Sequence, residues 1–133
     1  MSETASSSRI TSVGRVMVPA SDQDRAIEFY TQKLGFELLA DTPFGEGDRW
    51  VEVAPAAGGT ALALTQPRDS FQPGGNTNVA LTTRDIDATH AQLKDAGVDV
   101  DDEVSRFGGP VPPMFWFRDQ DGNTLLVVES PQQ

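Results

Sequence analysis

The chain has 133 residues, of which 38% are hydrophobic and 23% are charged, a composition typical of one globular domain. Its 10 basic and 20 acidic residues give a net charge of −10, which argues against nucleic-acid binding and favours the approach of cationic small molecules. It contains no cysteine, which excludes disulfides and thiol chemistry and suits a cytoplasmic protein, and no apolar run is long enough to cross a membrane.

The first half of the chain predicts one strand, a helix and three further strands. A Ser-rich segment at residues 1–11 is expected to be a disordered tail, and a single domain is expected over residues 12–133. The helix begins at Ser21–Asp24, which is close to a capping box, and it ends at Gly35, a residue suited to the turn after a helix. The strands are expected at residues 13–19, 36–40, 49–54 and 60–66.

The second half repeats this order of elements after a linker at residues 67–75 that contains proline and glycine. Asp22 aligns with Asp85, the expected cap of the second helix, and Ala63 aligns with Leu126, both at an offset of 63 positions. We therefore expect an internal repeat of two modules. The modules are expected at residues 13–66 and 76–130, and the strands of the second at residues 78–83, 98–104, 114–118 and 123–129.

Two motifs stand at the ends of this repeat: Val16–Asp22, which continues into Arg25–Tyr30 and Leu34–Glu37, and the turn Phe117–Leu125. They resemble the opening module and the closing turn of the vicinal oxygen chelate superfamily, which includes glyoxalase I, bleomycin-resistance proteins and extradiol dioxygenases. Gln120 departs from the proline that is usual in that turn. The resemblance implies an α+β fold in which two βαβββ modules form a curled mixed sheet with a shared concave pocket. Many relatives are homodimers, so we expect the same here.

The resemblance also implies where a metal would be held. In metal-dependent relatives, His, Gln or Glu side chains from the first and last strand of each module hold Fe, Mn, Ni or Zn. These four positions fall on Arg15, Ala63, Asn78 and Leu126. Ala63 and Leu126 have no lone pair to donate, a cationic Arg15 would repel a divalent ion, and Asn78 offers one neutral amide oxygen. We therefore expect no metal at this position and no other cofactor.

No pair of side chains suggests a nucleophile and its base, so the catalytic residues of an enzyme stay unassigned. The single histidine, His90, shares a helical stripe with Ile86 and Leu93, and we expect it to be packed or half-exposed rather than a ligand. The paired carboxylates suit helix caps and a hairpin turn. These pairs are Asp22/Asp24, Asp85/Asp87 and Asp119/Asp121.

Strands alternate their faces, so residues in phase with the four metal positions should line a small-molecule pocket. Aromatic side chains cluster near the third strand of each module, and their orientation stays open because they also suit a core or a dimer contact. Arg49 and Glu52 have opposite parity, so only one of them can face the pocket. The loop at residues 106–113 combines glycines with prolines and is a candidate lid. The expected ligand-binding residues are Arg15, Met17, Trp50, Ala63, Asn78, Thr82, Trp116 and Leu126.

Three functions are compatible with these observations. The first is a metal-free protein that binds or sequesters a small cationic or aromatic molecule, in the manner of bleomycin-resistance relatives. The alternative is a glyoxalase-like lyase or isomerase, or a dioxygenase, in which Arg15 would stabilise an oxyanion. The third is a regulatory or interaction module with an occluded pocket. The modules can pair within one chain or between two subunits, because the full reach of the linker is roughly 30 Å.

Overall fold

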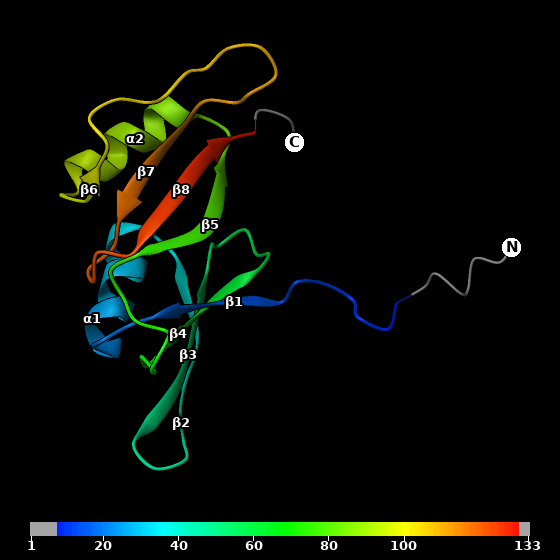
Figure 1. Ribbon diagram of the computed structural model, residues 1–133, viewed down its shortest axis with the longest axis vertical. Coiled ribbons are helices and arrows are strands. Elements are labelled where there is room, and N and C mark those ends of the chain that lie inside the picture. Colours follow the sequence, from blue (N-terminus) through cyan, green and yellow to red (C-terminus); the bar gives the residue numbers. More distant parts are fainter. Residues whose placement is uncertain (1–7, 131–133) are drawn as a thin grey trace, which may run out of the picture.

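The computed structural model describes residues 8–130, so residues 1–7 of the expected tail and residues 131–133 lie outside it. Residues 8–14 contain no helix or strand, and they lead into the first strand from the right of Figure 1. Among the described residues, no helix has the length and apolar character needed to cross a bilayer.

The first half of the chain folds as a βαβββ unit around one four-stranded sheet (Figure 1). Its elements are β1 (Arg15–Pro19), α1 (Gln23–Glu28), the π-helical turn η2 (Phe29–Lys33), β2 (Glu37–Phe44), β3 (Asp48–Ala54) and β4 (Ala61–Thr65). The strands lie in the order β1-β4-β3-β2. The β1–β4 pair is parallel, and the β4–β3 and β3–β2 pairs are antiparallel.

The second half has the same order of elements and the same sheet. Its elements are β5 (Asn76–Thr83), α2 (Ile86–Asp95), β6 (Asp99–Val100), β7 (Met114–Arg118) and β8 (Thr124–Glu129). The strands lie in the order β5-β8-β7-β6, again with one parallel pair, β5–β8, formed by the first and last strands. Met17 pairs with Ala63, and Ala80 pairs with Leu126, so one contact recurs 63 positions later. The predicted internal repeat is therefore confirmed.

The two helices begin in the same way. The side chains of Asp22 and Asp85 each accept a hydrogen bond from the backbone N–H three residues further on, at 3.1 and 3.0 Å. The first cap is therefore Asp22, and not Ser21 at the start of the expected capping box. Ser21 instead donates through its backbone N–H and its hydroxyl to the Asp121 carboxylate of the second module.

Two strands differ in length from the prediction by more than two residues. β2 runs on to Phe44, so the β2–β3 hairpin projects as a long arm at the bottom of Figure 1. The strand expected at residues 98–104 is shortened to β6, because the acidic run that ends at Glu103 has a low preference for strand. Asp101, just after β6, accepts a hydrogen bond from the backbone N–H of Trp116 through its side chain, at 3.1 Å.

Both helices lie at the left of Figure 1 and cover the same side of the two sheets. Between helices and sheets lies one apolar core. Its fully or almost fully buried members are Val18, Val51, Val53 and Leu64 from the first sheet, Phe115, Phe117, Leu125 and Val127 from the second, and Ala26, Tyr30, Ile86 and Leu93 from the helical segments. The two sheets stay separate within the described chain, and the face of each sheet opposite its helix remains open.

The turn between β7 and β8 joins the two modules through buried polar contacts. The Tyr30 hydroxyl donates a hydrogen bond of 2.8 Å to Asp119 Oδ2. Asn123 Nδ2 donates to the same oxygen at 3.0 Å and to the backbone carbonyl of Pro19 at 2.9 Å. Burial, reinforced by the nearby negative charge of Asp119, raises the pKa of Tyr30 well above its usual value. Tyr30 therefore acts as a neutral donor that ties the first module to the second.

Candidate ligand-binding site

The open face of the first sheet carries four of the expected binding residues: Arg15, Met17, Trp50 and Ala63. Strand register places Met17, Ala63 and Glu52 side by side across β1, β4 and β3. Met17 is 45% exposed, whereas Ala63 is completely buried beneath its neighbours. The surface of this face is therefore formed by the longer side chains around Ala63.

Three of these longer side chains form one hydrogen-bonded group. The Nε atom of Arg15 donates to Glu52 Oε2 at 2.8 Å, and the Nε1 atom of Trp50 donates to the same oxygen at 2.6 Å. The carboxylate is almost buried and is satisfied by two donors, one of them charged. This group, Arg15, Glu52 and Trp50, is called the Arg15 cluster below.

Glu52, and not Arg49, faces the open side of β3. Arg49 lies on the other face, where it forms ion pairs of 2.9 Å with Asp24 of α1 and with Asp41 of β2. The hydrogen bonds from Arg49 hold the pKa of the Asp41 carboxyl below its usual value. The alternation of the strand left open which of the two charges would face the site, and the structure assigns this place to Glu52.

Trp50 also belongs to an aromatic pair near the end of the β2–β3 arm. Its ring centroid lies 6.1 Å from that of Phe44, with an angle of 39° between the ring planes. The two rings border a cleft of about 330 Å³. Its lining also includes Thr65 of β4, Pro67 of the linker and the charged residues Asp48, Arg49 and Arg68. Apolar rings beside polar groups are the usual lining of a small-molecule site.

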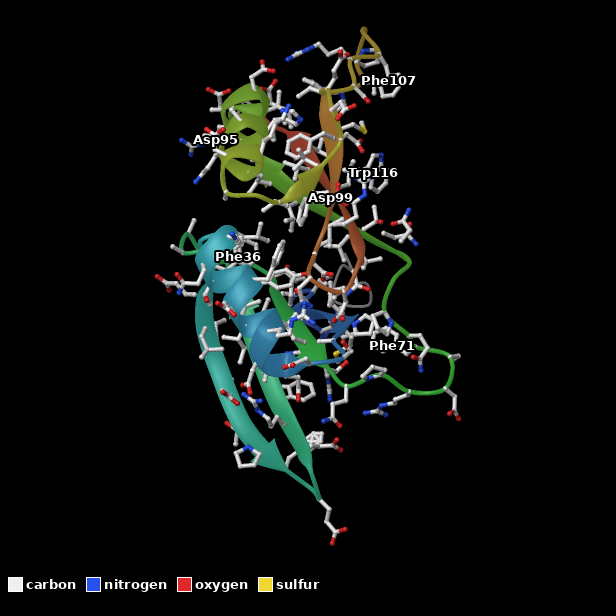
Figure 2. The ribbon with its side chains drawn as sticks, turned by 90° about the vertical axis from the view of Figure 1, so that its left-hand side faces the viewer. Phe36, Phe71, Asp95, Asp99, Phe107 and Trp116 are labelled. Atoms are coloured by element: carbon white, nitrogen blue, oxygen red, sulfur yellow. The ribbon has the colours of Figure 1, made fainter. Side chains whose placement is uncertain are left out.

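The open face of the second sheet carries three of the other four expected residues: Thr82, Trp116 and Leu126. Trp116 and Ala80 both pair with Leu126, and Thr82 pairs with Val128, so these side chains share one face. Trp116 projects from β7 on the side away from α2 (Figure 2). Phe115 and Phe117, the neighbours of Trp116 in the sequence, are completely buried on the helix side. The structure thus separates core aromatics from the aromatic side chain that is available to a ligand.

Asn78 has an unusual backbone. Its φ angle is +61°, in the left-handed region that residues other than glycine rarely occupy. It lies inside an irregularity of β5, between the paired residues Asn76 and Ala80, and its N–H is bonded to Asn76 Oδ1 at 2.8 Å. Asn tolerates this conformation better than most residues because its short polar side chain bonds locally. Asn78 is therefore exposed and stands outside the regular strand pairing, so the alternation of β5 does not assign its side chain to either face.

A second cavity, of about 230 Å³, lies beside the edge strands β1 and β5. It is lined by Met17, by Asn76 and Thr77, and by Phe71 of the linker. Two backbone hydrogen bonds between Arg68 and Phe71, of 3.0 and 2.8 Å, fold the linker into a tight turn, which Figure 2 shows at its right. From the sequence, this segment was expected to be a linker, and Phe71 was not among the expected ligand-binding residues. A single aromatic residue within a Pro/Gly segment was the available signal.

The side chains at the four positions that the resemblance assigns to a metal are a poor ligand set. Ala63 and Leu126 carry no donor atom, and Arg15 is already bound to the nearest carboxylate, Glu52. Within residues 8–130, no group of three or more His, Cys, Asp or Glu side chains is placed to hold a metal ion. His90 packs on the helix side, where its ring meets the Phe115 ring edge-on at 4.9 Å.

The family model of the glyoxalase/bleomycin resistance protein/dioxygenase superfamily matches residues 12–127. The chain belongs to this superfamily. Protein YetH of Bacillus subtilis is 32% identical to it over 127 residues, which cover 90% of this chain and 99% of YetH. The resemblance inferred from the two end motifs is thus confirmed.

Solved structures of this superfamily share the fold. TnmS3, an antibiotic-binding protein from Streptomyces sp. CB03234, is 36% identical with a TM-score of 0.80, and the match covers 92% of this chain and 98% of TnmS3. A superfamily member from Sphaerobacter thermophilus DSM 20745 is 35% identical with a TM-score of 0.84, covering 91% of this chain and 98% of that protein. The expected α+β architecture of two βαβββ modules is therefore shown.

Proposed function

We propose that this superfamily member is a metal-free protein that binds and sequesters a small, partly aromatic molecule. The observation that carries the proposal is the set of side chains on the two open sheet faces. At the four positions used for metal in relatives stand Arg15, Ala63, Asn78 and Leu126, and around them stand tryptophans and short polar groups. The similarity to TnmS3, which binds an antibiotic, supports the same kind of function.

The proposal includes a cytoplasmic homodimer. The open face of the first sheet presents exposed apolar side chains, such as Met17 and Phe44, and the open face of the second sheet carries the half-buried Trp116 and Leu126. The two sheets do not close on each other within the described chain, so a second copy can supply the facing wall of each pocket. The eight expected binding residues would then come together as two groups of four, one group from each subunit.

Metal analysis and ligand screening of the purified protein test this function. We expect far less than one equivalent of Fe, Mn, Ni or Zn, and a rise in unfolding temperature with some members of a panel of aromatic compounds. A ligand at 100 times its dissociation constant adds about 2.7 kcal/mol to the free energy of unfolding. One equivalent of bound metal that disappears in Arg15→Ala or Asn78→Ala would contradict the proposal.

The same screen also addresses the enzymatic alternative. Compounds that raise the unfolding temperature are incubated with the protein and then analysed by mass spectrometry. A binding protein returns each compound unchanged, whereas a lyase, isomerase or dioxygenase returns a product. A product whose formation is lost in Arg15→Gln would support the enzyme in place of the binding protein.

A further inference from the structure

The two charges of the Arg15 cluster are not equally available to a ligand. The Arg15 side chain is 49% exposed, whereas the Glu52 side chain is 11% exposed. A molecule that approaches this face therefore meets the guanidinium before the carboxylate. Although the whole chain carries a net charge of −10, contributions from distant surface charges are screened over about 8 Å at physiological ionic strength. The local charge, and not the total, decides which group binds at this position.

Glu52 fixes the direction in which Arg15 points. The ion pair uses the Nε atom of the guanidinium, and the carboxylate is held in turn by Trp50. Among residues 8–130, no hydrogen-bond partner is found for the two terminal nitrogens of Arg15. These nitrogens form a rigid fork of N–H donors that matches the two oxygens of a carboxylate or a comparable pair of acceptors.

Trp50 places an aromatic surface next to this fork. Because Trp50 Nε1 and Arg15 Nε bind the same oxygen of Glu52, the indole and the guanidinium are immediate neighbours. The Phe44 ring lies on the side of the indole away from Arg15, and the cleft that both rings border is lined by Arg49 and Arg68 and not by Arg15. A planar ring can rest on the indole of Trp50 while an oxygen substituent reaches the guanidinium.

We infer that Arg15 is the anchor for an anionic or strongly accepting oxygen on a planar aromatic ligand. Glu52 is the positioning residue that holds Arg15, and Trp50 forms the platform for the ring. The inference rests on the proposed small-molecule function and names the class of ligand, an aromatic acid or phenolate-like molecule. It differs from the cationic ligand that the acidic composition alone favours.

Three probes of one shape test the inference by isothermal titration calorimetry at neutral pH: 2-naphthoate, the neutral 2-naphthamide and the cationic 2-naphthylmethylamine. We expect the wild-type protein to bind 2-naphthoate at least about tenfold more tightly than 2-naphthamide, and the amine most weakly. Arg15→Gln should abolish the preference for the carboxylate. Arg15→Lys, which keeps the charge but lacks the fork, should retain a reduced preference.

Arg25→Gln is the matched control, because it removes the same charge from an exposed residue of α1 on the helix side. It should leave the order of the three probes unchanged. Preferential binding of the amine, or an Arg15→Gln protein with the same preference as Arg25→Gln, would overturn the inference while leaving a small-molecule function intact. Failure of all three probes to bind the wild-type protein would overturn the inference and would also count against the proposed function.

Discussion

The contribution of one side chain to the contact between the two modules can be measured at Tyr30, whose hydroxyl is bonded to Asp119. Tyr30→Phe removes the hydroxyl that donates to Asp119 but keeps the buried ring. Asp119 still accepts from Asn123, so no charge is left without a partner, and we expect a loss of about 1–2 kcal/mol in the free energy of unfolding. Urea denaturation measures it. Ser21→Ala, which removes an exposed hydrogen bond between the same modules, should cost less, and an unchanged Tyr30→Phe protein would show that their contact does not depend on this bond.

The raised pKa of Tyr30 makes the same contact sensitive to alkaline pH. Its value in the unfolded chain is about 10, and burial raises the pKa of the folded protein above it, so the folded state keeps the proton longer. The stabilisation is fully present below pH 10 and is lost as the pH rises towards the folded pKa. We expect the unfolding temperature of the wild type to fall more steeply above pH 10 than that of Tyr30→Phe. Tyr30 is the only tyrosine in the chain, so absorbance of the phenolate reports its titration directly.

For single residues in regular strands, the alternation of side chains between the two faces was enough to predict which residues share a face. The faces of Met17 and Ala63 followed from parity along β1 and β4, and their role in binding stays a prediction. The contact between Arg15 and Glu52 was not predictable, because the two residues are 37 positions apart and meet only through strand register. The left-handed backbone of Asn78 was also not predictable, because it occurs at an irregularity in the pairing of β5 with β8.

The helix caps permit a test at the scale of one element. Asp85→Ala removes the side chain that accepts from the backbone at the start of α2, and we expect a loss of about 1 kcal/mol in stability. Asp95→Ala, at the other end of the same helix, is the matched control. An acid at a helix C-terminus opposes the helix dipole, so its removal should be neutral or slightly stabilising. Equal losses in the two variants, measured by urea denaturation, would mean that capping is not the cause.

The order of the elements was predictable because each helix carries its own local start and stop signals. Both caps and both terminal glycines are visible in the sequence, and Gly35 and Gly97 have φ angles of +76° and +86°. The π-helical turn of η2, which contains Tyr30, was not predicted from the sequence. The strand preference of the acidic run explains the short β6, whereas the hydrogen bond between Arg118 of β7 and Asp101 could not be predicted from it.

For the whole molecule, the open sheet faces predict association. We expect light scattering after size-exclusion chromatography to give twice the mass of one 14.3 kDa chain. The physical reason is that the exposed apolar side chains Met17 and Phe44 on the open face of the first sheet are removed from water when a second copy covers that face. A monomeric mass at the highest soluble concentration, with ligand binding retained, would mean that one chain forms the pocket alone.

The repeat has kept its geometry and lost its chemical symmetry. Glu52 pairs with Ala63 on the first sheet, and Trp116 pairs with Leu126, the residue 63 positions later, on the second. A charged residue and an apolar ring therefore occupy equivalent places in the two modules. A molecule held between a first and a second module would meet a charged group on the side of the first module and none at the equivalent place of the second. The two ends of such a molecule would therefore be distinguished by the protein.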